Sequence, residues 1–519
     1  MSLVKSVVTV GGFTMISRIL GFIRDILIAV VLGAGPISDA FFVAFRIPNM
    51  FRRLVAEGAF SAAFVPLFAR QIEEESKETG LNFASHALGF LTGFLTLFSC
   101  LFMIFMPFLM QYLAPGFEVG GDRFERAVLY TRITFPYLMA MSIVALLGGV
   151  LNAYYKFAAM SAAPILLNII LISVLIVQLV WLDSDPGLAL SIGVTIAGVA
   201  QVAYLVIACK REGVLPPIIW PRFTEKVRRL FKLMLPGLLG AGVLQINILV
   251  GTIIASLLAT GSISYLYYAD RVYQLPLGVI GIAIGTALLP MLTRQLRSGV
   301  EAQANASMNR AVELSMLLTL PATAALMTID VPIISVLFEH GKFDSLATQT
   351  TAEALVAFAS GLPAYVLTKV YAPGFFARED TTTPVIVGVV AMILNIVLSL
   401  ILIDTFAHVG IAIATSLAAW LNAGTLLLLL LIRGHHRMDI RLLKRVSGAL
   451  LASALMVVFL NFTADFLKDQ LLANDLLTKV ASLALLILGG GSIYAITSLL
   501  FGAARISELK TMLRRTPQS

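Results

Sequence analysis

The sequence predicts an all-α membrane protein with fourteen transmembrane helices, and three observations lead to this prediction. The 519 residues are 59% hydrophobic and only 13% charged, whereas soluble domains are about 45–50% apolar and about 25% charged. The apolar residues gather in runs that are long enough to cross about 30 Å of hydrocarbon. Lysines and arginines concentrate on one side of these runs, as the positive-inside rule requires. A soluble cytosolic enzyme is thereby excluded.

The expected spans follow one another along the whole chain, and their even number places both chain ends on the same side of the membrane. The first is expected to be a retained span and not a cleaved signal peptide, because Arg18 and Arg24 interrupt it and no A-x-A cleavage site follows. The spans cover roughly residues 7–32, 38–62, 83–112, 127–151, 159–182, 187–209, 233–258, 264–291, 311–338, 350–373, 383–404, 408–432, 446–464 and 476–503.

The distribution of the 37 lysines and arginines gives the orientation of these spans. With fourteen crossings, 24 of these residues lie on the side of the N-terminus, 5 lie in the opposite loops and 8 fall within spans. Cytoplasmic loops carry the excess of lysine and arginine in membrane proteins. We therefore expect both termini in the cytoplasm, and we attribute the net charge of +8 to membrane anchoring and not to nucleic-acid binding.

Two stretches about 225 residues apart resemble each other and indicate an internal repeat. LGAGPISDAFF at 32–42 corresponds to LATGSISYLYY at 258–268, and VPLFARQ at 65–71 corresponds to LPMLTRQ at 289–295. Six spans in each copy make this a parallel repeat, with a substrate site expected between the two lobes. The expected domains are an N-terminal lobe at 1–220 (spans 1–6), a C-terminal lobe at 221–440 (spans 7–12), and two appended spans with a cytoplasmic tail at 441–519.

Charged side chains are concentrated in the first two spans, with a further pair in the eighth. An arginine at the centre of a spanning helix costs about 2.5–3.5 kcal/mol on insertion scales, so these groups must be paired or line a water-filled cavity. The set contains six arginines and four acids, so pairing each acid with one arginine would leave an excess of positive charge. Guanidinium is well shaped for bidentate binding of phosphate, which predicts an anionic, phosphorylated substrate. The residues are Arg18, Arg24, Asp25, Asp39, Arg46, Arg52, Arg53, Glu57, Asp270 and Arg271.

A structural interpretation of the same charges stays open at this point. Ion pairs such as Arg53 with Glu57, four residues apart, would merely tie helices together. On a straight helical wheel Arg52 points away from the polar stripe of the second span, but Pro48 permits a kink that would change the phase beyond it. The wheel groups Ser17, Arg18, Gly21, Asp25 and Ile28 on the first span, with Arg24 at the edge of this face, and Asp39, Arg46, Asn49, Arg53 and Glu57 on the second.

Other chemistries have little support in the sequence. The two cysteines lie in apolar runs, the five histidines have no metal-ligand spacing, and no Walker motif is present. We therefore expect no cofactor, no metal site and no catalytic residues. The only dense acidic run, Glu73 to Glu75, is expected in a solvated cytoplasmic loop and not at a magnesium site.

Three motifs of this chain resemble the MurJ (MviN-type) lipid II flippases, a family within the multidrug/oligosaccharidyl-lipid/polysaccharide exporter superfamily. They are SRILGFIRD (17–25), SDAFFVAFRIPNMFRRLVAEGAFSAAFVP (38–66) and YYADR (267–271). The motif APGFFAR (372–378) and the fourteen-span layout extend the resemblance over essentially the whole chain. The resemblance implies a transporter of the bacterial inner membrane, active in peptidoglycan biosynthesis, cell-wall biogenesis and cell shape. It would move the undecaprenyl-diphosphate-linked precursor to the outer leaflet by alternating access, with the prenyl tail held by the two appended helices.

By matching position, the resemblance also implies which residues bind the substrate. It favours Arg52 over Arg53, against the straight wheel. Gln274 stands where relatives can carry an acid, and the seventh span offers Gln245 and Asn247 but no carboxylate for a sodium ion. The implied substrate-binding residues are Arg18, Arg24, Asp39, Arg52 and Arg271, with Ser17, Asp25, Asn49, Arg53, Glu57 and Asp270 as secondary candidates.

Two other functions remain as alternatives. Another exporter of the same superfamily, for a polysaccharide-lipid or a drug, would share the fold, although an arginine-rich first lobe disfavours a cationic drug. A membrane-embedded enzyme acting on polyprenyl phosphates would need clustered acids for a metal ion or an activated base. The expected partners are lipid II, membrane lipids and the cell-wall synthesis machinery, with no nucleic acid.

Overall fold

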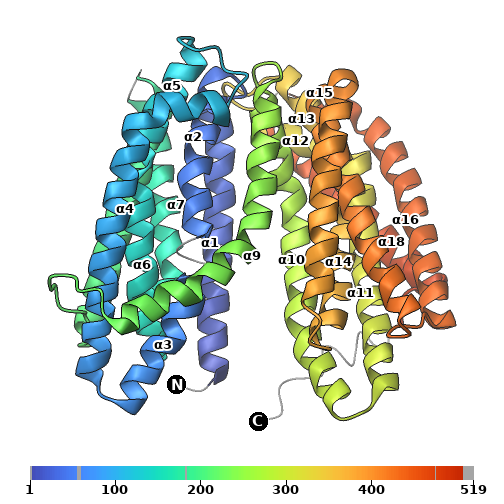
Figure 1. Cartoon of the computed structure of the whole chain (residues 1–519). Coiled ribbons are helices and arrows are strands. Elements are labelled where there is room, and N and C mark those ends of the chain that lie inside the picture. Colours follow the sequence, from blue (N-terminus) through green and yellow to red (C-terminus); the bar gives the residue numbers. More distant parts are fainter. Residues whose placement is uncertain (1–2, 55–59, 182–183, 474, 506–519) are drawn as a thin grey trace. The chain divides into compact units, whose positions relative to one another are not determined.

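The computed structural model describes residues 3–54, 60–181, 184–473 and 475–505, and every regular element in these residues is a helix (Figure 1). The all-α prediction is therefore confirmed for the described residues. The helices are α1 (Leu3–Leu32), α2 (Pro36–Arg52), α3 (Ser61–Glu74), α4 (Lys77–Leu113), α5 (Asp122–Thr134), α6 (Pro136–Ala153), α7 (Phe157–Val180), α8 (Pro186–Arg211), α9 (Glu225–Ser256), α10 (Ser262–Arg297), α11 (Glu301–Thr328), α12 (Asp330–Phe338), α13 (Ser345–Ser360), α14 (Leu362–Phe376), α15 (Thr382–Ile432), α16 (Ile440–Phe466), α17 (Lys468–Leu471) and α18 (Leu476–Leu500).

Nine helical segments within the described residues are long and apolar enough to cross a membrane. Several of them display large apolar side chains on their outer surface, such as Leu97 and Ile104 on α4 and Leu488 on α18. Soluble monomers rarely expose apolar surface on this scale, whereas in a bilayer these side chains face hydrocarbon. The chain is therefore built as a multi-pass membrane protein.

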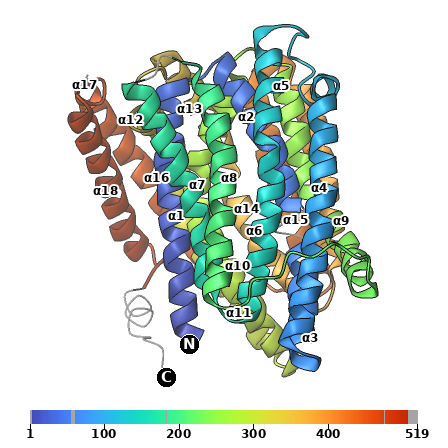
Figure 2. The same cartoon turned by 90° about the vertical axis from the view of Figure 1, so that its left-hand side faces the viewer.

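The described residues form two compact units, the first with residues 1–264 and 340–343, the second with residues 265–339 and 344–519. In the first unit, α7 packs between α1 and α8, as Figure 2 shows. The α5–α6 segment lies at the centre of the unit, because 78% of its most apolar window is buried, against 17% for α4. A stack of Phe60, Phe64 and Phe68, completed by Phe83, fills the space between α3 and α4.

The second unit also has one deeply buried segment, formed by α13 and α14, with 72% of its most apolar window buried. This segment and α5–α6 are both interrupted near a proline. Pro136 opens α6 directly after α5, and Pro363 lies in the first turn of α14. Proline has no N–H group and cannot continue the hydrogen bonding of a preceding helix, which explains both interruptions.

The long helix α15 is a hairpin of two helices. Its 51 residues would extend roughly 76 Å if straight, far more than the thickness of a bilayer. The backbone reverses at Ala407, which has non-helical angles of φ 47° and ψ −130°. The two ends of the element meet, since Arg433 donates a hydrogen bond of 2.7 Å to Asp380. The expected spans 383–404 and 408–432 therefore lie in the two arms of one hairpin.

Asp380 also holds the start of α15. Its carboxylate accepts hydrogen bonds from the hydroxyl and the backbone N–H of Thr383, at 2.6 and 2.9 Å. These bonds, together with the charge of Arg433, lower the pKa of Asp380 to about 2. The carboxylate therefore remains ionised at physiological pH and satisfies the first turn of the helix.

Two glycines in the first unit allow a close crossing of backbone segments. Gly33 at the end of α1 and Gly341 both have left-handed angles, φ 66° and φ 62°. A Cβ atom on Gly33 would collide with the carbonyl group of Lys342, and one on Gly341 would collide with Val30. The N–H of Lys342 donates to the carbonyl of Val30 at 2.9 Å and fixes the crossing. Glycine is required here because other residues would meet both steric and conformational strain.

A buried acid joins α16 to α11 within the second unit. Glu313 of α11 is 6% exposed and forms an ion pair with Arg310 of the same helix. It also approaches Arg445 of α16 at 3.1 Å and Arg441 at 3.6 Å. Arg310 reaches Asp439, the N-cap of α16, at 2.5 Å. Helix α18 packs against α16 (Figure 1). The ion-pair network therefore attaches the start of α16, and α18 with it, to α11.

Replacing Glu313 with glutamine is expected to destabilise the second unit by about 3 kcal/mol, because Arg445 would lose its buried partner. The measurement is the thermal unfolding of the purified protein in detergent. The matched control is Glu301→Gln, which changes an exposed acid at the start of the same helix and should leave the melting temperature unchanged. Equal melting temperatures for the two variants would refute the role assigned to Glu313.

Candidate functional site

The first-unit candidates lie on α1 and α2, and Arg24 and Asp25 form a buried pair. The Nη2 and Nε atoms of Arg24 donate to Asp25 Oδ1 at 2.8 and 3.1 Å. Arg24 Nη1 donates at 3.0 Å to Asn168 of α7, whose side chain also donates to the carbonyl of Ser17 at 2.8 Å. Three hydrogen bonds to two residues, Asp25 and Asn168, therefore orient the guanidinium. Arg18, six residues before Arg24 on the same helix, has an exposed side chain.

Asp39 serves as a cap for another helix. Its carboxylate is 1% exposed and accepts hydrogen bonds from the N–H groups of Gly261 and Ser264, at 2.7 and 3.0 Å. The Ser264 hydroxyl donates to it at 2.6 Å. Gly261 and Ser264 flank the beginning of α10, so Asp39 satisfies N–H groups that have no partner within that helix. The carboxylate also lies where the helix dipole favours negative charge.

Arg123 of α5 completes the surroundings of Asp39. Its Nη1 lies 3.8 Å from Asp39 Oδ2, its Nη2 donates to the Gly116 carbonyl at 3.3 Å, and its guanidinium stacks over Phe117. Arg123 belongs to a loop in the expected layout, and its contact with Asp39 could not be foreseen from its position in the sequence.

The arginines of α2 have different environments. Arg46 donates to the Thr252 hydroxyl at 2.5 Å, and Arg52 Nε donates to Asn49 at 2.7 Å. The Arg53 side chain is exposed. The backbone turns π-helical at Arg53, and a π-helical turn advances by a different angle per residue, so the straight wheel does not hold there. Glu57, the proposed partner of Arg53, lies outside the described residues.

In the second unit, Asp270 and Arg271 lie near the start of α10. The Arg271 guanidinium lies 4.6 Å from the centroid of the Tyr267 ring, a cation–π contact. Asp270 accepts a hydrogen bond from Gln274, one turn later. The side-chain amide of Gln274 donates a hydrogen bond to Asp270, whereas an acid at position 274 would repel the Asp270 carboxylate.

Two residues that sequence reasoning did not select belong to this description. Asn168 orients Arg24, and the only signal for it is a polar residue within an apolar run. Lys369 lies within α14 and has an exposed side chain, and a single lysine inside an expected span was the available signal. The described residues contain no cluster of three or more histidine, cysteine, aspartate or glutamate side chains that could hold a metal ion.

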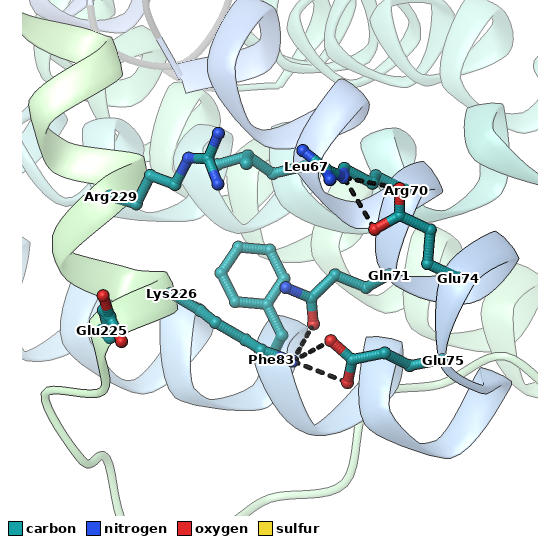
Figure 3. Close-up of a pocket in the computed structure, with 9 residues that line it drawn as sticks. All are labelled: Leu67, Arg70, Gln71, Glu74, Glu75, Phe83, Glu225, Lys226 and Arg229. Atoms are coloured by element: carbon teal, nitrogen blue, oxygen red, sulfur yellow. Dashed lines mark hydrogen bonds and ion pairs between the residues drawn. The ribbon is translucent and has the colours of Figure 1, made fainter.

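A pocket of about 300 Å³ lies where α9 meets α3 and α4 (Figure 3). Lys226 of α9 donates to Glu75 at 2.7 and 2.8 Å and to Gln71 at 3.0 Å, while Arg70 pairs with Glu74. Three basic and three acidic side chains line the pocket, so its formal charges balance. The bonds of Lys226 around the pocket therefore hold the start of α9 against the end of α3. The pocket lacks the excess of positive charge expected of a phosphate-binding site.

Comparisons with known proteins identify the family of this chain. Residues 28–482 match the family model for the lipid II flippase MurJ. The chain is 43% identical over 521 residues to a probable lipid II flippase MurJ of Rhizobium meliloti strain 1021, covering 99% of this chain and 97% of the relative. It is 33% identical to the lipid II flippase MurJ of Burkholderia cenocepacia, covering 88% and 89%.

Solved structures of other proteins share the fold of this chain. A lipid II flippase MurJ in an inward closed conformation aligns with a TM-score of 0.78 and 26% identity, over 95% of this chain and 98% of that one. An inward-facing multidrug resistance transporter of the MATE family, in the MOP superfamily, aligns with a TM-score of 0.70 at 14% identity, over 82% and 97%, which shows a shared fold. MurJ proteins are transporters and not enzymes. The chain therefore belongs to the MurJ family of lipid II flippases.

Proposed function

We propose that this protein moves lipid II, the undecaprenyl-diphosphate-linked peptidoglycan precursor, from the cytoplasmic to the outer leaflet by alternating access. Membership of the MurJ family supports the substrate class. The observation that carries the proposal is the concentration of arginines on α1, α2 and α10, with more guanidinium groups than nearby acids. A diphosphate is the substrate group that such guanidinium groups bind best.

The candidate residues fall into two roles in this proposal. Arg18, Arg24, Arg52 and Arg271 are the groups that bind the diphosphate. Asp39 is a positioning residue, because its carboxylate is occupied with the start of α10. Secondary contributions are assigned to Ser17, Asp25, Asn49, Arg53, Glu57 and Asp270.

The proposal includes fourteen crossings arranged as a parallel repeat, with lobes at 1–220 and 221–440 and an appendage at 441–519. Three features support it. The α15 hairpin supplies two crossings where one continuous helix would not fit. The α5–α6 and α13–α14 segments are the most buried apolar segments in the described residues, and they begin 223 residues apart. Both are interrupted near a proline, at Pro136 and Pro363, which lie 227 residues apart, close to the spacing of the repeat.

The protein is placed in the bacterial inner membrane, with both termini in the cytoplasm because of the excess of lysine and arginine on that side. The membrane potential, worth about 2.3 kcal/mol per elementary charge per 100 mV, would favour inward movement of cationic groups of the empty carrier. Such a bias would reset the binding site after release. The cell-wall synthesis machinery is the proposed recipient of the flipped precursor.

A second candidate is export of another substrate by the same fold, favoured by the structural likeness to a multidrug transporter. The excess of arginine over acid distinguishes the two, because it would repel a cationic drug. An enzyme acting on polyprenyl phosphates is disfavoured by the lack of a three-residue metal cluster in the described residues.

The test uses the purified full-length protein in vesicles that contain lipid II labelled on its peptide. Wild-type protein should accelerate movement of the label across the bilayer, and unlabelled undecaprenyl diphosphate should compete with it. Transport of a cationic dye without movement of lipid II would support the drug exporter, and a chemically altered lipid II would support the enzyme. In cells, depletion of the protein should cause lipid II to accumulate in the inner leaflet.

A further inference from the structure

Lys369 is a charged residue within an apolar spanning segment of the second unit. It lies on α14, seven residues before the end of the helix at Phe376, and its side chain is exposed. No acidic side chain of the described residues forms an ion pair with it. A lysine in this position is costly if it faces lipid, and intramembrane lysines generally face a water-filled space.

The stem of Lys369 lies across a glycine of α10. A Cβ atom built on Gly281 would lie 2.8 Å from Lys369 Cδ and 3.1 Å from its Cε, whereas one on Gly285 would lie 3.9 Å from Lys369 Cβ. Gly281 therefore provides the space through which the side chain passes. This contact fixes the face of α10 that the lysine meets.

That face of α10 is polar toward its start. At about 100° per residue, Asp270, Gln274, Gly278, Gly281 and Gly285 fall within about 80° of one another and form one stripe. The side chain of Gln274 is exposed and bonded to Asp270, so the part of the stripe nearest the start of α10 carries polar side chains. Lys369 lies over Gly281 in the same stripe, and Gly281 is about 16 Å along the helix axis from Asp270.

We propose that Lys369 is a further cation that binds the diphosphate of the substrate, at a position separate from Arg271 and nearer the cytoplasm. The inference rests on the proposed function and extends it. The distance along α10 is too long for one diphosphate to reach both groups, so the two act in succession as the head group moves. Lysine suits brief binding of a moving phosphate, because its ammonium is a compact point charge and does not impose the fixed two-bond geometry of guanidinium.

The first experiment asks what Lys369 faces. Lys369→Cys is prepared in a background in which Cys100 and Cys209 are replaced, and it is treated in vesicles with a membrane-impermeant, positively charged thiol reagent. The thiol should react, and undecaprenyl diphosphate should slow the reaction at least tenfold. Absence of reaction would place the side chain in lipid and overturn the proposal, as would a reaction that the diphosphate does not slow.

The second experiment measures the half-saturating concentration of lipid II for flipping. Lys369→Met, which keeps the length of the side chain without its charge, should raise this concentration about tenfold, and Lys369→Arg should restore most of the loss. The matched control is Lys444→Met, which removes an exposed lysine of α16 and should change nothing. An unchanged value for Lys369→Met would overturn the proposal.

A glycine pair tests the geometry separately from the charge. Gly281→Ala should displace the lysine stem and raise the half-saturating concentration of lipid II with Lys369 in place, while Gly285→Ala should leave that concentration unchanged. Equal effects of the two would contradict the assigned path of the side chain. If wild-type protein flips lipid II and Lys369→Met does so equally well, only this inference fails. If wild-type protein moves no lipid II, the proposed function fails.

Discussion

Replacing Arg24 with glutamine is expected to reduce lipid II flipping at least about 100-fold, the largest functional effect anticipated for a single substitution. Each hydrogen bond from a guanidinium to a charged partner contributes about 1.5–3 kcal/mol, and loss of two such bonds to a diphosphate accounts for a decrease of this size. Asn168 and Asp25 hold the Arg24 guanidinium in one orientation, so a glutamine cannot reproduce its geometry. The measurement is the initial rate of flipping by equal amounts of folded protein in vesicles.

The same substitution also leaves Asp25 buried without its partner, at a cost of about 3–5 kcal/mol. The double variant Arg24→Gln with Asp25→Asn removes the whole pair and separates the two effects. It should recover the melting temperature of the wild type and remain inactive in flipping. Recovery of flipping in the double variant would show that Arg24 acts only as a structural partner of Asp25, and the substrate role would be wrong.

Replacing Asp39 with alanine is expected to lower the free energy of unfolding by about 2–4 kcal/mol. The substitution leaves the N–H groups of Gly261 and Ser264 buried without an acceptor, and each such group costs about 1–3 kcal/mol. Thermal unfolding in detergent measures the effect. Asp39→Asn keeps one acceptor oxygen and should lie between alanine and the wild type.

The matched control for Asp39 is Asp122→Ala. Asp122 is a 62%-exposed acid that pairs with Arg126 one turn along α5, and exposed pairs of this kind contribute 0.2–1 kcal/mol in typical measurements, about a quarter of the effect expected at Asp39. If the Asp39 variant melts like the wild type yet fails to flip lipid II, the carboxylate contacts the substrate directly and the assignment as a cap is wrong. If flipping falls only in proportion to the folded fraction, the positioning role stands.

Much of the helical layout could be predicted from the sequence because apolar runs of membrane length have few alternatives to a helix in lipid. The runs 383–404 and 408–432 were separable by length alone, and Ala407 does lie between them. The interruptions at Pro136 and Pro363 were not predicted as ends of helices. A proline inside an apolar run permits either a kink or a break, and tertiary packing decides which one forms.

The site was less predictable, because its geometry depends on partners that are distant in the sequence. The wheel placed Arg24 at the edge of the polar face of α1, but Asn168, 144 residues away, orients its guanidinium. Asp39 was selected as a charged residue in a costly place, while its role depends on N–H groups more than 220 residues further along the chain. No periodicity within a single helix encodes such contacts.

The short segment 340–343 belongs with the first unit, although the residues on either side of it belong with the second. The polypeptide consequently passes from one unit to the other at three places, after Ser264, before His340 and after Phe343. Any relative movement of the two units would therefore be taken up at three places along the backbone and not at one. Residues 33 and 341 both belong to the first unit, so a covalent link between them would hold the segment 340–343 against the end of α1 and would leave the passage after Ser264 unrestrained.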